Sequence, residues 1–200
     1  MNKKEKIILG LFDREMIKFG EFTLRSGIKS PIYINMREII GYPEFMDFVA
    51  EEYVNKIKDS GVKFDRVTSV AYGALGTGFA VASKLKKPVI VVRKEGAKQH
   101  GMGGRVVGPK KDGDTAVIIE DLITKGGSVN DVVDSLREEG LMVNDAFILL
   151  DREQGGMENL AKNKVKGYPI LTITEMLEVL EKNGKIDSKR KEEVLKFLKK

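Results

Sequence analysis

The chain has 200 residues, a formal net charge of +5, 42% hydrophobic residues, no Cys and one His. This length suits one domain with its own core, and no apolar run approaches the roughly 20 residues that a membrane-spanning helix needs. The lack of Cys excludes disulfides, thiolate nucleophiles and Cys-ligated zinc, and a single His excludes a His cluster. We therefore expect a cytoplasmic protein without membrane contact.

The first part of the chain predicts two helices with a hairpin between them. Residues 3–19 carry charges on both sides of a short apolar stretch, which favours an amphipathic helix over a signal peptide. Residues 22–35 contain the dipeptides Ser-Gly and Ser-Pro and are expected to form a hairpin-like stretch. Residues 43–60 predict a second helix, with Pro43 near its start and Gly61 at its end.

The central part of the chain alternates short β-rich runs with helical stretches. The expected strands are residues 64–70, 88–93, 115–121 and 145–151, and the expected helices are residues 75–85 and 128–140. Continuous apolar strands that alternate with helices indicate an α/β fold with a mainly parallel sheet covered on both faces. Ligands of such sheets bind beyond the carboxyl ends of the strands. Residues that leave each strand are therefore the candidates for a functional site.

One strand end carries both acids and glycines. The strand 115–121 ends on Glu120 and Asp121 and runs into Thr124-Lys125-Gly126-Gly127-Ser128 before a helix. Backbone N–H groups of a glycine turn at a helix start form an anion site that suits a phosphate. The two carboxylates only accept hydrogen bonds, which suits sugar hydroxyls or hydrated Mg²⁺. The pattern favours a ribose 5-phosphate site, and a plain glycine turn before a Ser-capped helix is the alternative.

Two further loops follow strands. The stretch Gly73-Ala-Leu-Gly76-Thr-Gly78 lacks dinucleotide spacing, and it is either a second phosphate-binding loop or an ordinary helix start. Residues 93–105 hold four basic groups, four glycines and His100. Such a segment suits a lid that closes over a polyanion. An exposed hairpin or a nucleic-acid patch are the alternatives, although no aromatic residue is interleaved there to stack on bases.

Four motifs together resemble the orotate phosphoribosyltransferases, which are type I phosphoribosyltransferases. IIEDLITKGGS resembles the family's motif for 5-phosphoribosyl 1-diphosphate (PRPP), and FGEFTLRSGIKSPIYIN resembles its N-terminal hood. RKEGAKQHGMGG resembles its catalytic loop, and ILLDREQGG resembles the strand end with the orotate-binding Arg. The resemblance covers essentially the whole chain and is strongest to the part fused to a decarboxylase in UMP synthases. The chain has no room for a decarboxylase barrel, so only the first activity is expected.

The resemblance implies a type I phosphoribosyltransferase fold in a single domain. The hood would span about residues 1–40, the core about 62–155 and C-terminal hood helices about 165–200. The implied reaction joins orotate to PRPP and gives orotidine 5′-monophosphate (OMP) and pyrophosphate, within UMP biosynthesis. It further implies Mg²⁺ bound mainly through PRPP and water, with no direct protein ligand. The implied assembly is a homodimer whose catalytic loop is shared across subunits, without nucleic-acid or membrane partners.

The resemblance also assigns residues. The implied catalytic residues are Lys98, His100 and Asp121. Residues implied to bind PRPP are Tyr72, Gly73, Arg93, Lys94, Lys98, His100, Glu120, Asp121, Leu122, Ile123, Thr124, Lys125, Gly126, Gly127 and Ser128, with Lys94 contributed by the partner subunit. Residues implied to bind orotate are Arg25, Tyr33, Ile34, Thr124 and Arg152. The structural alternatives are ordinary core packing for Tyr33 and Ile34 and a surface ion pair for Arg152.

The chain departs from the family pattern at two points. Some members carry a Lys after the Tyr of the pyrophosphate loop, whereas this chain has Gly73, so one side-chain contact to pyrophosphate is missing. The catalytic loop is one residue longer, because Glu95, Gly96 and Ala97 separate Lys94 from Lys98. This insertion leaves the division of roles between Arg93 and Lys94 open.

Two rival functions remain to be separated from this one. A phosphoribosyltransferase for a purine base would share the PRPP motif, but the Arg152 strand end and the hood motif favour orotate. A PRPP-sensing regulator would keep the phosphate loop without needing a catalytic loop or a base-binding Arg, and this chain carries both.

Overall fold

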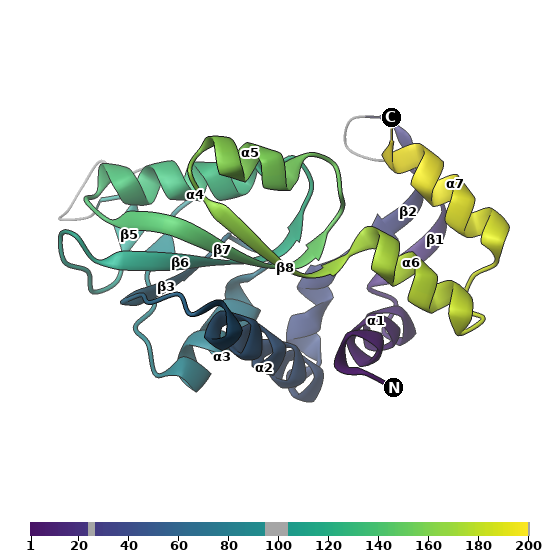
Figure 1. The fold of residues 1–200 in the computed structure, drawn as a ribbon, viewed down its shortest axis with the longest axis horizontal. Coiled ribbons are helices and arrows are strands. Elements are labelled where there is room, and N and C mark those ends of the chain that lie inside the picture. Colours follow the sequence, from purple (N-terminus) through teal and green to yellow (C-terminus); the bar gives the residue numbers. More distant parts are fainter. Residues whose placement is uncertain (24–26, 95–103, 200) are drawn as a thin grey trace.

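The computed structural model describes residues 1–23, 27–94 and 104–199 of the chain (Figure 1). Its elements in chain order are α1 (Lys3–Asp13), β1 (Ile17–Thr23), β2 (Lys29–Ile34), the 3₁₀ helix η1 (Met36–Gly41), α2 (Pro43–Ser60), β3 (Arg66–Ser69), α3 (Leu75–Leu85), β4 (Val91–Val92), β5 (Val106–Val107), β6 (Thr115–Ile123), α4 (Gly127–Glu138), β7 (Met142–Asp151), α5 (Gly156–Lys162), β8 (Lys166–Thr172), α6 (Ile173–Lys182) and α7 (Ser188–Leu198).

The centre of the fold is a parallel sheet with the strand order β3-β6-β7-β8. Helices α2 and α3 cover one face of this sheet, and α4 and α5 cover the other (Figure 1). This arrangement confirms the predicted α/β fold with a mainly parallel sheet flanked by helices. Since all four strands run the same way, their carboxyl ends lie at one edge, where a ligand site is expected.

The predicted helix of residues 43–60 is confirmed in full as α2. Pro43 stands in its first turn, and Gly61 ends it in the left-handed conformation with φ 69°. Such a φ is open to glycine at little cost, which explains why the helix stops there. The buried side of α2 includes Tyr53, whose hydroxyl donates a hydrogen bond of 2.6 Å to the backbone oxygen of Glu120. This bond ties α2 to β6 beside the predicted site.

The structure corrects the predicted strand at residues 88–93. Val89 forms a single parallel bridge with Val67, and Val91–Val92 pairs instead with Val106–Val107 in a separate antiparallel ribbon. The sheet gains β8 at its other edge, a strand that sequence analysis missed. Pro169 lies within β8 and would be unfavourable in a central strand, but an edge strand has a free side on which the missing N–H costs nothing.

The N-terminal helix is shorter than predicted. The expected helix over residues 3–19 ends at Asp13, and Glu15 turns the chain with φ 56°. Ile17 then begins β1 and pairs with Ile34 of β2 in an antiparallel hairpin. Cross-strand pairing and burial of Ile17 therefore decide its structure over the local helical pattern. A hairpin-like stretch was predicted only for residues 22–35, so its second strand is confirmed and its first strand begins earlier than expected.

The two ends of the chain pack together beside the sheet. The β1–β2 hairpin and α1 lie next to α6 and α7, on the side where β8 leads directly into α6 (Figure 1). The capping box at the start of α6, formed by Thr172 and Glu175, explains why strand and helix join without a loop. These elements adjoin the site because β2 continues into η1.

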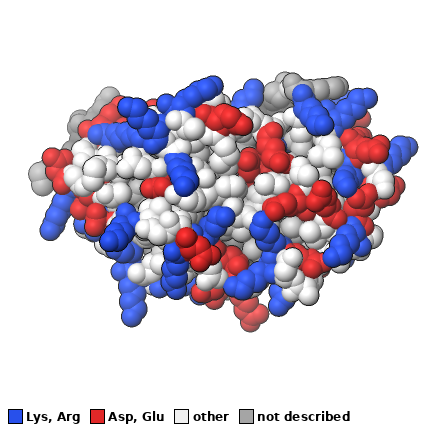
Figure 2. All heavy atoms as spheres, in the orientation of Figure 1, with Lys and Arg blue, Asp and Glu red and all other residues white. Residues whose placement is uncertain are grey.

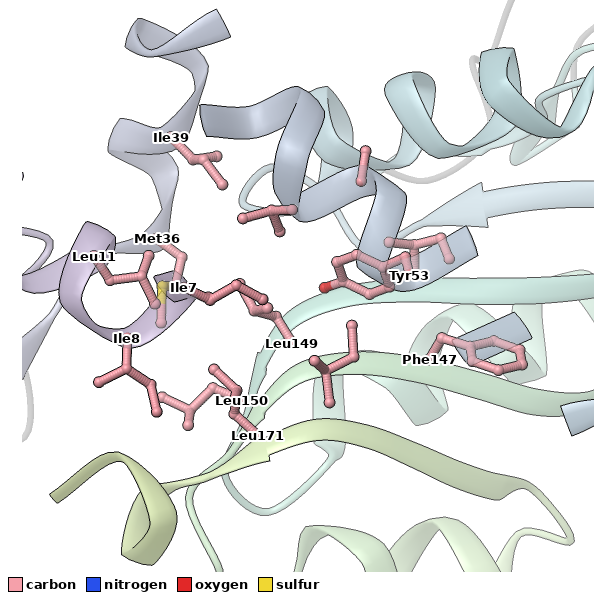
Figure 3. Close-up of a cluster of buried hydrophobic side chains, with 14 of the residues drawn as sticks. Ile7, Ile8, Leu11, Met36, Ile39, Tyr53, Phe147, Leu149, Leu150 and Leu171 are labelled. Atoms are coloured by element: carbon pink, nitrogen blue, oxygen red, sulfur yellow. The ribbon is translucent and has the colours of Figure 1, made fainter. Parts of the chain in front are cut away.

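The main core joins this terminal assembly to the sheet. Figure 3 shows α1, η1 and α2 directing apolar side chains toward β7 and β8. Its members include Ile7, Ile8, Leu11, Met36, Ile39, Leu149 and Leu171, all nearly inaccessible to solvent. Burial of a large aliphatic side chain contributes about 1.5–3 kcal/mol, so this cluster fixes η1 against the sheet.

On the face drawn in Figure 2, Lys and Arg side chains are interspersed with Asp and Glu. Within the described ranges, none of the helices combines the length and the apolar character required to cross a bilayer.

Candidate active site

The carboxyl ends of β3 and β6 form the candidate active site. The two strands pair from Arg66 to Ser69, and β6 then continues through Glu120 and Asp121 beside the loop Val70–Gly73. A cleft of about 520 Å³ opens here. Its walls are formed by Ile34, Asn35, Met36, Arg37, Val70, Ala71, Tyr72, Gly73, Lys94, Glu120, Asp121, Leu122, Thr124 and Ser128. The cleft therefore joins four segments that are far apart in the sequence.

Asp121 lies directly against the backbone of Gly73. A Cβ atom built at Gly73 would overlap the carboxylate of Asp121 and would come within 2.7 Å of its Cγ. The pyrophosphate loop and the carboxylate strand thus pack so closely that a side chain at position 73 would require the Asp121 carboxylate to shift.

Glu120 is one of the few acidic side chains buried in the protein, with only 6% of its surface exposed. Burial raises the pKa of Glu120 well above its ordinary value, and the neighbouring negative charge of Asp121 raises it further. Burial also raises the pKa of Asp121, whereas hydrogen bonds to its carboxylate and, to a smaller extent, the positive charge of Arg37 lower it. The Oε2 atom of Glu120 has no hydrogen-bond partner among the described residues. The pair is therefore prepared to accept hydroxyl donors from a ligand.

The predicted phosphate loop surrounds a separate hollow of about 50 Å³ beside the cleft. Gly126 has φ 78° and precedes α4, so the chain turns sharply and directs the first N–H groups of the helix outward. Gly156 packs behind the loop, where an added Cβ would come within 2.6 Å of the Thr124 carbonyl oxygen. Free N–H groups at a helix start attract anions. Glu120 and Thr124 line both this hollow and the cleft, so the two spaces adjoin.

The cleft wall also includes the basic Lys94 and two polar residues that sequence analysis missed. The Lys94 ammonium lies 5.4 Å from the centre of the Tyr72 ring of the same chain. Asn35 and Arg37 enter the cleft wall from the segment after β2. The signal that could have found them is a polar pair spaced among the buried apolar residues Met36 and Ile39, directly after a predicted hairpin.

The residues predicted to bind orotate are only partly brought together. Ile34 and Thr124 line the cleft. Tyr33 is 41% exposed, packs on Phe22 with ring centres 5.5 Å apart and is not part of the cleft wall. The high exposure argues against the alternative that Tyr33 is ordinary core.

Arg152 follows β7 at the same edge of the sheet. Its backbone N–H donates a hydrogen bond of 3.0 Å to the carbonyl oxygen of Ile123. Its Nε atom is buried without a partner among the described residues, and burial lowers the pKa of the guanidinium. A buried guanidinium without a carboxylate partner suits an anionic ligand. Within the described residues Arg152 forms no ion pair, which argues against the alternative that it is part of a surface ion pair.

The remaining predicted residues divide into two groups. Arg25, Lys98 and His100 lie outside the described residues. Arg93 and Lys125 are described but are not part of the cleft wall. Lys125 instead lines a shallow surface hollow with residues of α5.

The donor set fits Mg²⁺ held mainly by a ligand. In the part of the chain that the structure describes, no group of three or more acidic or His side chains could hold a metal by itself. Glu120 and Asp121 nevertheless offer hard oxygen atoms, including the unpaired Glu120 Oε2. Mg²⁺ prefers such oxygens and keeps several waters or phosphate oxygens in its shell.

Comparison with known proteins places these features in one family. Residues 42–169 match the phosphoribosyl transferase domain family. The chain is 39% identical over 176 residues to orotate phosphoribosyltransferase of Methanocaldococcus jannaschii, covering 88% of this chain and 98% of that protein. It is 38% identical over 192 residues to uridine 5′-monophosphate synthase of Bos taurus, covering 96% of this chain.

A solved structure gives the same result. Leishmania donovani UMP synthase superposes with a TM-score of 0.88 at 32% identity over 98% of this chain. The chain spans only 40% of the bovine synthase and 42% of the Leishmania chain. The match to the M. jannaschii enzyme extends over nearly its whole length. The chain belongs to the phosphoribosyltransferase family and, within it, to the orotate phosphoribosyltransferases.

Proposed function

We propose that the chain transfers the 5-phosphoribosyl group of PRPP to orotate, giving OMP and pyrophosphate in pyrimidine nucleotide biosynthesis. The observation that carries this proposal is the junction at the end of β6, where a phosphate-sized hollow adjoins a cleft with two carboxylates. PRPP presents a 5′-phosphate, a ribose with two hydroxyls and a pyrophosphate in that order. Family membership supports the same assignment.

In this account the sugar lies along β6. Backbone N–H groups and hydroxyls from Thr124 to Ser128 bind the 5′-phosphate, supported by Leu122 and Ile123, which hold the loop to the sheet. Glu120 and Asp121 accept hydrogen bonds from the ribose hydroxyls. Tyr72 and Gly73 offer backbone groups to the pyrophosphate at the opposite wall.

The chemistry breaks the bond between C1 of the ribose and the pyrophosphate oxygen, and the bonding electron pair leaves with pyrophosphate. A ring nitrogen of orotate then bonds to C1, and the proton that this nitrogen carried passes to the leaving pyrophosphate or to water. Positive charge develops on the sugar between these events, and the Asp121 carboxylate stabilises it from the cleft wall. Mg²⁺, when bound with PRPP, neutralises charge on the leaving pyrophosphate. Lys98 and His100 are proposed to assist the same leaving group, with Arg93 and Lys94.

Orotate is proposed to bind between the sugar and the end of β7. Arg152 would pair with its carboxylate through two parallel hydrogen bonds, and its buried, unpartnered Nε supports this role. Ile34 and Thr124 would contact the pyrimidine ring from the cleft wall, with Tyr33 and Arg25 contributed by the hood.

The single domain, from the hood over the core to the C-terminal helices, is proposed to act as a homodimer. Ile40 of η1 and Phe79 of α3 are 63% and 51% exposed. They lie near each other, because Ile40 packs at Gly76, one turn before Phe79. Exposed apolar side chains of this size are typical of a subunit interface. Lys94 is proposed to reach the site of the partner subunit, and sedimentation of the wild type and Phe79→Glu would test the assembly.

A base panel tests the proposed function. The purified protein is mixed with PRPP, Mg²⁺ and one of orotate, adenine, hypoxanthine or uracil, and the absorbance of each base is followed. We expect rapid loss of orotate alone. Consumption of adenine or hypoxanthine would show that the substrate is a purine base. Tight PRPP binding without consumption of any base would indicate a PRPP sensor.

A further inference from the structure

We propose that Arg37 binds the pyrophosphate group of PRPP and supplies the cationic contact that Gly73 cannot make. This inference rests on the proposed function, since it assigns a residue to one part of that substrate. Sequence motifs gave no role to Arg37.

Arg37 stands in the first turn of η1, which begins directly after β2. Its neighbours Met36 and Ile39 are buried in the main core, and Asn35 donates a backbone hydrogen bond of 2.8 Å to the Met16 carbonyl oxygen. The backbone that carries Arg37 is therefore fixed on both sides, while its own side chain is exposed at the cleft wall.

The space beside Gly73 is already occupied. The Asp121 carboxylate occupies the space that a side chain at position 73 would need. A side chain at position 73 would have to share this space with the Asp121 carboxylate, and Gly73 itself offers no side chain. Any cationic contact at this part of the cleft must therefore come from another segment.

The cleft wall carries charged groups of both signs. Among the charged residues of the cleft wall, Glu120 and Asp121 are negative, and Arg37 and Lys94 are positive. Arg37 and Asp121 line the same cleft, and the positive charge of Arg37 contributes to lowering the pKa of Asp121. Within residues 1–23, 27–94 and 104–199, no carboxylate lies within 4.0 Å of the Arg37 guanidinium.

These three observations favour a ligand contact. A guanidinium has a planar fork of donors that matches phosphate oxygens, and the exposed Arg37 side chain can form such a pair when the anion binds. The contact would act on both PRPP and the pyrophosphate product, because both carry the same group. It would not act on OMP, which has the ribose 5-phosphate and the base but no pyrophosphate.

Binding of two products therefore tests the proposal. Calorimetry would measure the affinity of the wild type, Arg37→Ala and Arg37→Lys for magnesium pyrophosphate and, separately, for OMP. Arg190→Ala is the matched control, because Arg190 is an Arg of α7 whose guanidinium pairs with Glu193 outside the cleft. We expect Arg37→Ala to weaken pyrophosphate about tenfold or more and OMP by less than about twofold. Arg37→Lys should restore part of the loss, and the KM for PRPP should rise more than the KM for orotate.

Two results would overturn the proposal. An unchanged affinity of Arg37→Ala for pyrophosphate would show that Arg37 does not contact this group. Equal losses of affinity for pyrophosphate and for OMP would show that Arg37 only supports the structure of the cleft. Failure of the proposed function looks different, because the wild type itself would then not consume orotate.

Discussion

The Asp121 carboxylate lies against the backbone of Gly73 and fills the space where a side chain at that position would begin. The contact joins the strand that is proposed to stabilise the sugar to the loop that is proposed to bind pyrophosphate. Displacement of either partner should therefore disturb both parts of the substrate.

Gly73→Ala is the smallest change that tests this contact. The added Cβ would push the Asp121 carboxylate away, and a misplacement of about 1 Å at a reacting centre costs on the order of 100-fold in rate. We expect a loss of this order in turnover with an unchanged circular dichroism spectrum. Gly41→Ala is the control, since nothing lies within 4 Å of a Cβ built there. Equal turnover of Gly73→Ala and Gly41→Ala would show that the contact between Asp121 and Gly73 does not contribute to catalysis.

Asp121→Asn keeps the shape of the side chain and removes its charge. If the carboxylate stabilises positive charge on the sugar, turnover should fall by about 10²–10³, as for other electrostatic groups of active sites. The melting temperature should stay the same or rise, because a buried charge is removed. Asp59→Asn, at an exposed position of α2, provides the comparison. Unaltered turnover would exclude Asp121 from the mechanism.

Glu120 gives the protein a pH dependence whose sign follows from its burial. Its pKa in the folded state is raised well above the ordinary value of 4.5, so the folded protein holds this proton more tightly than the unfolded chain. The contribution of Glu120 to stability is fully present below the unfolded pKa and is lost as the pH rises through the folded pKa. Melting temperatures of the wild type should therefore fall relative to Glu120→Gln as the pH is raised above the ordinary value of 4.5. Parallel curves for the two proteins would contradict the raised pKa.

Arg152→Ala tests the orotate site. Loss of a charge-assisted contact of about 1.5–3 kcal/mol should raise the KM for orotate by about 10- to 150-fold. The KM for PRPP should change far less, because Arg152 follows β7 and is not part of the cleft wall. Arg190→Ala again controls for loss of an Arg outside the cleft. Equal increases in both KM values would refute the pairing of Arg152 with the orotate carboxylate.

The sequence predicted the central elements because their patterns are strong and local. Continuous apolar runs marked β6 and β7, and Pro43 and Gly61 marked the ends of α2. Two elements depended on tertiary pairing instead. Residues 17–19 join the hairpin, although they continue the apolar pattern of α1, and β8 contains a Pro that only its edge position makes acceptable.

Sequence analysis predicted the part of the candidate site that lies directly at the end of a core strand. The pair Glu120 and Asp121 and the glycine loop after it are readable from sequence because strand, acids and glycines are consecutive. Arg37 was missed because its cleft position depends on how η1 packs against the distant β7 and β8 through Met36 and Ile39. The polar pair Asn35 and Arg37 among the apolar Met36 and Ile39 indicates a half-buried turn, but it does not report which strands that turn packs against.

Phosphorus NMR of the reaction mixture tests the central claim most directly. PRPP and Mg²⁺ are incubated with the protein, first alone and then with one equivalent of orotate. The account predicts that PRPP persists alone and that orotate converts it into equal amounts of pyrophosphate and a phosphomonoester, which is OMP. PRPP that stays intact in the presence of orotate, or that is hydrolysed equally without it, would contradict transfer to orotate.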